Sequence, residues 1–259
     1  KEGYQTLPRR PLEKRKLRYE DVYPVLYLKY RLSQQAERSN IKHLVIDEMQ
    51  DYSRLQYLII RRMFSCKMTI LGDRAQTMAD QQQDVLQFLP GIFGKDLRRI
   101  EMRKSYRNTV EIASYAANLI GVTDLELFER HGMPVLERDV TDLEAALREA
   151  VDTLFPDEKT YETAAVIVPD EKTAERAYLI LREILAEKDF DCEKRLSWLN
   201  RDSSSFKKGL TVTTFYLAKG LEFDQVFSIF PKDEKREIMM QAQYIAATRA
   251  LHELRVYHI

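Results

Sequence analysis

The chain has 259 residues, of which 44% are hydrophobic and 32% charged, and its acidic and basic residues cancel to a formal net charge of zero. This composition is typical of a globular protein with one large or two modest α/β domains, and it excludes a disordered chain and a solenoid. No apolar run approaches the roughly 20 residues that a membrane span needs, so we expect a cytoplasmic protein with no membrane partner.

The first third of the chain alternates helical and strand patterns. Tyrosines at helical spacing predict a helix at the start, and we interpret their stripe as a packing face rather than a base-stacking platform. The elements expected here are a helix over 19–37, a strand over 41–46, a helix over 53–64, a strand over 68–73 and a helix or turn over 81–94. We expect a domain boundary near residues 95–97.

The same alternation continues to the end of the chain. The expected elements are strands over 97–102, 164–169, 210–215, 224–230 and 252–258, and helices over 108–120, 141–155, 171–187 and 236–250. Several of these strands are continuous β-branched runs, which are typical of parallel sheets covered on both faces. We therefore predict an α/β fold of parallel sheets flanked by helices.

Two cysteines and four histidines lack the spacing of a disulfide framework, a zinc site or a Cys/His catalytic pair. Basic residues predominate in 1–31 and 194–219, and acidic residues in 137–193. Segregated basic stretches could follow a phosphate backbone, although solvated faces of a highly charged protein explain them as well.

The stretch LVIDEMQDYS, residues 44–53, is an apolar run that stops on two carboxylates, Asp47 and Glu48. In parallel α/β sheets, ligands gather at the carboxyl ends of the strands. A carboxylate at that position can hold Mg²⁺, and its neighbour can accept a proton from a water that attacks a phosphoryl group. The stretch alone fits a solvated strand end equally well.

The order of five segments along the chain favours the nucleotide site over a solvated strand end. They are IKHLVIDEMQDYS (41–53), LGDRAQ (71–76), SYRNTVEIASYAANLI (105–120), TVTTFYLAKGLEFDQV (211–226) and YIAATRAL (244–251). Together they resemble motifs of the UvrD/Rep-like superfamily 1 DNA helicases, and YLAKGLEFD and AATRALHEL look most like the HelD or helicase IV branch. The resemblance implies RecA-like (P-loop NTPase) motor domains, an incomplete first one over 1–96 and a nearly complete second one over 97–259.

The resemblance assigns ATP and Mg²⁺ as cofactors and gives roles to residues of the first segments. Asp47 would hold the metal and Glu48 would orient or activate the hydrolytic water. Gln50 and Gln76 would sense the γ-phosphate, since an amide can bond both water and phosphate oxygens.

In the later segments, the resemblance assigns Arg107 and Arg249 to the charge that develops on the transferred phosphoryl group. Taken singly, either arginine would be read as half of a surface ion pair. Gly220 would permit close backbone approach, and Glu222 would bond a ribose hydroxyl or couple the nucleotide state to nucleic acid.

Contacts with nucleic acid, in the first place single-stranded DNA, fall on the fifth segment and the cations before it. The candidates are Thr213, Thr214, Tyr216 and Lys219, with Lys207 and Lys208 nearby. The ring of Tyr216 could stack on a base or simply pack, and Lys219 could be only a solvated cation.

The main departure from the family is that no GxxxxGK[ST] segment occurs in the 259 residues. Such a loop supplies much of the grip on ATP, so we expect a fragment of a longer protein that is inactive alone. The full protein would be an ATP-dependent DNA helicase or translocase. Two alternatives stay open: a HelD-like ATPase that acts on RNA polymerase, and a non-catalytic interaction module.

Overall fold

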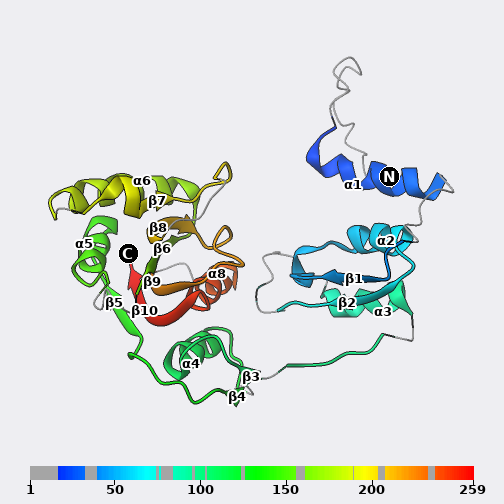
Figure 1. The fold of residues 1–259 in the computed structure, drawn as a ribbon, viewed down its shortest axis with the longest axis horizontal. Helices are drawn as coiled ribbons and strands as arrows, with labels where there is room; N and C mark the ends of the chain where they lie inside the picture. Colours follow the sequence, from blue (N-terminus) through cyan, green and yellow to red (C-terminus); the bar gives the residue numbers. More distant parts are fainter. Residues whose placement is uncertain are drawn as a thin grey trace, which may run out of the picture. The chain divides into compact units, whose positions relative to one another are not determined.

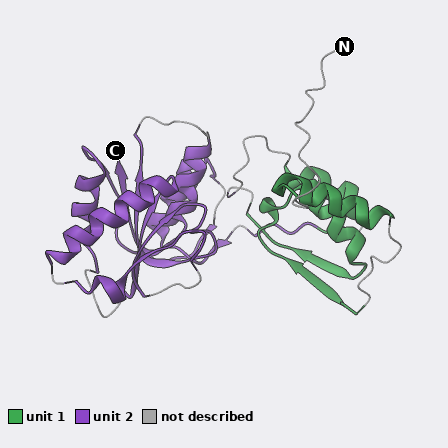
Figure 2. Ribbon diagram, turned by 90° about the horizontal axis from the view of Figure 1, so that it is seen from above, with its two compact units in different colours: residues 1–73, 83–98 green, residues 74–82, 99–259 purple. Residues whose placement is uncertain are grey.

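The computed structural model describes residues 17–32, 40–73, 76, 84–94, 97–102, 104–123, 126–155, 161–188, 190–203, 208–232 and 237–259. The chain divides into two compact units (Figure 2), unit 1 with residues 1–73 and 83–98 and unit 2 with residues 74–82 and 99–259. No helix within the described ranges is long and apolar enough to cross a membrane. The cytoplasmic location stays a prediction.

Unit 1 is a small parallel sheet with helices packed against it. Its elements are α1 (Tyr19–Leu32), β1 (His43–Ile46), the 3₁₀ turn η2 (Met49–Asp51), α2 (Arg54–Met63), β2 (Lys67–Ile70) and α3 (Val85–Phe93) (Figure 1). β1 pairs with β2 in parallel, with Ile46 opposite Ile70. The core gathers Ile46 with Tyr57 of α2 and Val85 and Leu89 of α3. The strand over 41–46, the helix over 53–64 and the helix or turn over 81–94 are therefore confirmed within a few residues, the strand over 68–73 ends at Ile70, and residues 81–83 lie outside the described ranges.

The helix predicted from residue 19 is confirmed as far as Leu32, and residues 33–37 lie outside the described ranges. None of its residues is fully buried. The side chain of Tyr19 is 76% exposed and meets Tyr23 edge to face, with ring centroids 6.2 Å apart. The predicted packing face is therefore wrong for Tyr19, whereas Tyr23, Tyr27 and Tyr30 are half-buried.

Unit 2 is built on a six-stranded sheet in the order β5-β10-β9-β6-β8-β7, in which every neighbouring pair is parallel. The strands are β5 (Leu136–Asp139), β6 (Thr163–Val168), β7 (Leu196–Trp198), β8 (Gly209–Thr214), β9 (Phe223–Phe230) and β10 (Ala250–His258). The helices are α4 (Val110–Leu119), α5 (Leu143–Asp152), α6 (Glu171–Ala186), α7 (Cys192–Arg195) and α8 (Glu237–Ala247). The predicted α/β fold with a parallel sheet flanked by helices is confirmed.

Both faces of this sheet are covered, which is why its inner strands β6, β8 and β9 are almost entirely buried. In β6, Ala164, Val166 and Val168 join a core with α5 and α6, while Ala165 and Ile167 join a second core with α4 and α8. Figure 1 shows α5 and α6 on one side of the sheet and α4 with α8 on the other. The alternation of a strand places successive side chains on opposite faces, so β6 contributes to both cores.

The strand predicted over 97–102 is wrong. This segment has no regular structure, and Ile100 and Met102 are 76% and 85% exposed. A strand needs a partner for its backbone groups, and none of the described strands pairs with this segment. The nearest strand is β3 (Lys104–Ser105), which pairs with β4 (Glu126–Leu127).

Within the described ranges, the short elements that were not predicted are η2, β3, β4, β5, α7 and β7. Each spans only two to four residues, too few for a helical or alternating pattern to stand out. β5 reads LERD, and three of its four residues are exposed because it forms one edge of the sheet.

Candidate functional site

In unit 1, predicted site residues lie where β1 and β2 end. Because β1 and β2 are parallel, their carboxyl ends lie at the same edge of the sheet. Backbone hydrogen bonds continue to join the two segments beyond the last paired residues. The amide of Leu71 donates to the carbonyl of Ile46 at 2.8 Å, and the amide of Met49 donates to the carbonyl of Leu71 at 2.8 Å. Residues 47–50 and 71–73 are therefore held side by side.

Glu48 turns the chain sharply at this edge. Its backbone lies in the left-handed region, with φ 52° and ψ 50°, which is uncommon for a residue with a side chain. The amide of Glu48 donates to Asp47 Oδ1 at 2.8 Å, and Gln50 Nε2 donates to Glu48 Oε2 at 2.5 Å. The surrounding bonds keep Glu48 in a conformation that costs on the order of 1–3 kcal/mol.

Gln50 connects the two strand ends. Besides donating to Glu48, its side chain accepts a hydrogen bond from the amide of Asp73 at 3.1 Å, and it is buried. One amide thus joins the carboxylate after β1 to the backbone after β2. The structure brings Asp47, Glu48 and Gln50 together at the end of β1, and their roles stay predictions.

α2 packs against the turn at residues 47–50 and holds it through a hydrogen bond. Tyr57 is fully buried and its hydroxyl donates to the carbonyl of Met49 at 3.0 Å. Burial raises the pKa of Tyr57 well above its usual range, so the phenol keeps its proton. α2 begins directly behind the turn at a capping box, in which Ser53 and Gln56 each bond the other's backbone amide.

Gly72 was not singled out among the candidates, although it belongs to the quoted LGDRAQ segment. A Cβ at this position would lie 2.4 Å from Met49 Cγ and 2.5 Å from Gln50 Oε1. The close approach of β2's end to the turn therefore requires glycine. The signal in the sequence is a glycine directly after an apolar strand.

The carboxylates of unit 1 fit Mg²⁺ only as partial ligands. Within the described ranges, no group of three or more His, Cys, Asp and Glu side chains could hold a metal ion by itself. Proteins commonly bind Mg²⁺ through one or two carboxylates together with water and substrate phosphates. The exposed carboxylate of Asp47 suits that mode.

In unit 2, Arg249 is the best-fixed of the predicted residues. It lies between α8 and β10, is 2% exposed, and donates through Nε to the carbonyl of Ile245 at 3.2 Å. Its Nη1 donates to the carbonyl of Leu221 at 3.4 Å, and Nη2 to Thr248 Oγ1 at 3.1 Å and Gln76 Oε1 at 3.4 Å. Gln76 is itself buried. Two predicted residues from distant segments therefore meet.

Arg107 forms an ion pair with Glu222, Nε to Oε1 at 2.6 Å, and the two side chains are 46% and 42% exposed. The surface ion pair suggested for an isolated arginine thus describes Arg107, while Arg249 is buried. Leu221 and Glu222 are consecutive, so one short segment contacts both guanidinium groups. Gly220 precedes it with φ 76°, a left-handed conformation that glycine adopts without strain.

The predicted nucleic-acid residues have different surroundings. Thr213 and Thr214 are fully buried in β8, and Thr213 Oγ1 donates to the carbonyl of Leu199 at 3.2 Å. The Thr214 hydroxyl has no hydrogen-bond partner within the part of the chain that the structure describes. Neither hydroxyl reaches the surface of unit 2, so their contact with a backbone phosphate stays a prediction.

Tyr216 is half-buried against Phe215, with ring centroids 5.3 Å apart, and the guanidinium carbon of Arg201 lies 6.0 Å from the centroid of the Tyr216 ring. Packing and cation contact both occupy this ring, and its stacking on a base stays a prediction. Lys219 is half-buried and Lys208 pairs with Glu162 at 2.5 Å. Lys207 and the basic residues 1–16 lie outside the described ranges.

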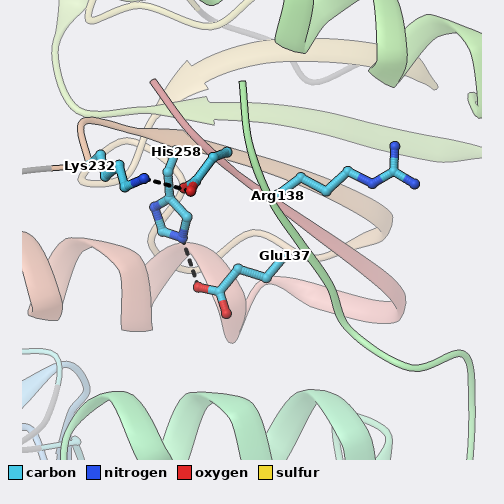
Figure 3. Close-up of a pocket in the computed structure, with 5 residues that line it drawn as sticks. Glu137, Arg138, Lys232 and His258 are labelled. Carbon is cyan, nitrogen blue, oxygen red and sulfur yellow. Dashed lines mark hydrogen bonds and ion pairs between the residues drawn. The ribbon is translucent and has the colours of Figure 1, made fainter. Parts of the chain in front are cut away.

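An open cavity of about 420 Å³ in unit 2 is lined by Glu137, Arg138, Asp139, Lys232 and His258. Figure 3 shows the His258 imidazole pointing to the Glu137 carboxylate, 2.7 Å away, and Arg138 pointing away from both. The cavity lies at the carboxyl ends of β5 and β10, whereas Arg249 precedes the first residue of β10. No predicted site residue lines it.

Residues 4–78 match the model of the UvrD/REP helicase N-terminal domain. The matched segment contains Asp47, Glu48, Gln50 and Gln76, and it supports a helicase-like function for the protein. None of the curated proteins matches the sequence. The more specific resemblance to the HelD or helicase IV branch stays a prediction.

Solved structures similar to this chain include the C-terminal domain of a possible DNA helicase from Lactobacillus plantarum WCFS1, with TM-score 0.46 and 24% identity over 60% of this chain and 88% of that one. The PRRSV helicase has a TM-score of 0.46 and 17% sequence identity, and the match covers 84% of this chain and 35% of that one. Arterivirus nonstructural protein 10 (helicase) in complex with DNA has a TM-score of 0.45 and 15% sequence identity, and the match covers 84% of this chain and 39% of that one. The chain thus spans well under half of either viral protein.

Proposed function

We propose that this chain is part of an ATP-dependent superfamily 1 DNA helicase or translocase, with motor-domain segments at 1–96 and 97–259. The observation that carries the proposal is the convergence in unit 2 of residues from four separate motif segments. Arg107 and Arg249 contact the Leu221–Glu222 segment, and Gln76 accepts a hydrogen bond from Arg249, although the four come from distant parts of the chain. The match of residues 4–78 supports the same reading.

The residues of unit 1 would act on the metal and the water. A bound Mg²⁺ would neutralise phosphate charge, and the exposed carboxylate of Asp47 would be one of its ligands. Glu48 would orient the attacking water and accept its proton. Gln50 holds the Glu48 carboxylate, so it would set the direction of that base as well as sense phosphate.

The residues of unit 2 would stabilise charge on the transferred phosphoryl group. Arginine suits this role because its planar donors stay charged, and in enzymes where it was measured such an arginine is worth about 10³–10⁵ in rate. Arg249 is buried and bonded in place, so little conformational entropy remains to be lost when it binds. Arg107 first has to leave Glu222, an exposed pair that opens at little cost.

Single-stranded DNA is the proposed track, contacted by the segment that contains Tyr216 and Lys219. Arg201 beside Tyr216 adds a cation to the aromatic ring, a combination that single-strand binding proteins use. None of the described contacts favours RNA polymerase as the substrate. The proposal therefore names DNA alone.

The test is the MgATPase activity of the full-length protein with and without single-stranded DNA. We expect DNA to stimulate hydrolysis and Glu48→Gln and Arg107→Ala to lower kcat at least about 100-fold, the scale of removing a transition-state charge partner. Glu149→Gln and Arg148→Ala, which change exposed ion pairs on α5, are matched controls that should keep wild-type rates. The 1–259 chain alone should be inactive.

A full-length protein without ATPase activity would support a non-catalytic interaction module and overturn the proposal. Activity that survives Glu48→Gln would overturn the assignment of that carboxylate. Hydrolysis without any response to DNA would overturn the choice of track while leaving the hydrolytic residues in place.

A further inference from the structure

Asn108 follows Arg107 directly and was not among the predicted site residues. Its side chain is buried, 7% exposed. Nδ2 donates to the carbonyl of Ala250 at 2.6 Å and to the carbonyl of Thr248 at 3.2 Å. These two carbonyls flank Arg249 on either side.

We propose that Asn108 is a positioning residue that fixes the backbone of Arg249 and, through its own place in the chain, sets that arginine relative to Arg107. This inference rests on the proposed function, in which both arginines act on one phosphoryl group. The neighbouring carbonyl, that of Arg249 itself, accepts from the amide of Phe223 at 2.9 Å. Three consecutive carbonyls are thus held from outside their own segment.

The segment needs outside donors because Thr248 follows the end of α8, where carbonyls lack partners within the helix, and because β10 is irregular after Ala250. The register between β9 and β10 shifts between Ala250 and Glu253, so the regular ladder is interrupted. A bulge leaves backbone groups without ladder partners, and buried carbonyls must find other donors. Asn108 supplies them at Thr248 and Ala250, and the guanidinium of Arg130 donates to the carbonyl of Leu251.

Asn108 can hold these carbonyls in place because hydrogen bonds and packing contacts also hold the start of α4. Thr109 caps the helix by accepting from the amide of Ile112 at 3.4 Å. The amide of Val110 donates to the carbonyl of Arg130 at 2.9 Å. A Cβ on Gly132 would lie 2.6 Å from Thr109 Cγ2, so the loop packs directly on the cap.

The consequence is a short connection between the two arginines. Arg107 precedes Asn108 and pairs with Glu222, while Arg249 lies between the two carbonyls that Asn108 holds and donates to Leu221. Loss of the amide would free the backbone on both sides of Arg249. Displacement of a catalytic group by about 1 Å can cost on the order of 100-fold in rate.

The test uses Asn108→Ala in the full-length protein, with Asn118→Ala as the matched control. Asn118 lies on the same helix, α4, but is exposed. We expect Asn108→Ala to lower kcat about 10- to 100-fold with KM for MgATP changed less than about threefold, because an interaction made in the transition state is misplaced. Asn118→Ala should keep wild-type values.

Asn108→Ser keeps one hydroxyl donor and should recover part of the rate, and it replaces Asn108→Ala if that variant fails to fold. Asn108→Asp should be at least as slow as Asn108→Ala, because a carboxylate cannot donate to either carbonyl. In an Arg249→Ala background, Asn108→Ala should add no further loss, since residues that act through one another are not additive. Unchanged kcat in Asn108→Ala, or a full additional loss in the Arg249→Ala background, would overturn the inference.

A second measurement separates this inference from the proposed function. Hydrogen exchange of the Phe223 amide, which donates to Arg249, should be faster in Asn108→Ala than in Asn118→Ala by at least about tenfold. If the wild-type protein has no ATPase activity and the Phe223 amide still exchanges faster in Asn108→Ala, the proposed function is overturned and the positioning contact stands. Equal exchange in the two variants would overturn the contact itself.

Discussion

Replacing Gly72 by alanine should push the end of β2 away from the turn that holds Glu48. The added Cβ would lie 2.4 Å from Met49 Cγ, 2.5 Å from Gln50 Oε1 and 2.7 Å from the backbone nitrogen of Met49. The Met49 side chain can rotate, but its nitrogen cannot, because it donates to the carbonyl of Leu71. Overpacking of this kind costs about 1–3 kcal/mol.

Gly91→Ala is the matched control, because nothing lies within 4 Å of the Cβ it would add and Gly91 is inside α3. In a helix interior, alanine is more favourable than glycine by about 0.5–1 kcal/mol. The two substitutions add the same methyl group to unit 1 and should change its stability in opposite directions.

Hydrogen exchange of the Met49 and Leu71 amides in unit 1 measures the effect, since both amides bond across the two strand ends. The fluorescence of Trp198, the one tryptophan of the sequence, reports unfolding of unit 2 and should be unaffected by either substitution. Exchange in Gly72→Ala that is as slow as in Gly91→Ala would refute the steric reasoning.

Two further predictions concern single contacts. Tyr57→Phe removes the hydroxyl that bonds the Met49 carbonyl and should destabilise unit 1 by about 1–3 kcal/mol, measured by the same amide exchange; unchanged exchange would mean that the carbonyl finds another donor. A hydrogen bond from His131, with backbone donors, lowers the pKa of Glu111 from 4.5 to about 2. Its contribution to stability is therefore complete above about pH 4.5 and lost as the pH falls from 4.5 toward 2, and Glu111→Gln should flatten the stability of unit 2 across that window in acid denaturation.

The long elements of this protein were predictable from the sequence. β6, β8 and β9 consist mostly of apolar or β-branched residues, and short runs of this kind are typical of strands buried on both faces. The order of the five motif segments also marked Arg107 and Arg249 as candidates. The strand runs are local signals, since each depends on residues that are close together in the chain, whereas the motif order extends from residue 41 to residue 251.

Tertiary structure decided which groups each candidate meets. Arg107 pairs with Glu222, Gln76 bonds Arg249, and Asn108 holds the backbone around Arg249, contacts between segments about 115 to 173 residues apart. It also left residues 97–102 without a strand partner. A periodic pattern reports the face that a residue buries, but the partner of a polar group depends on strand order, bulges and crossovers that no local pattern contains.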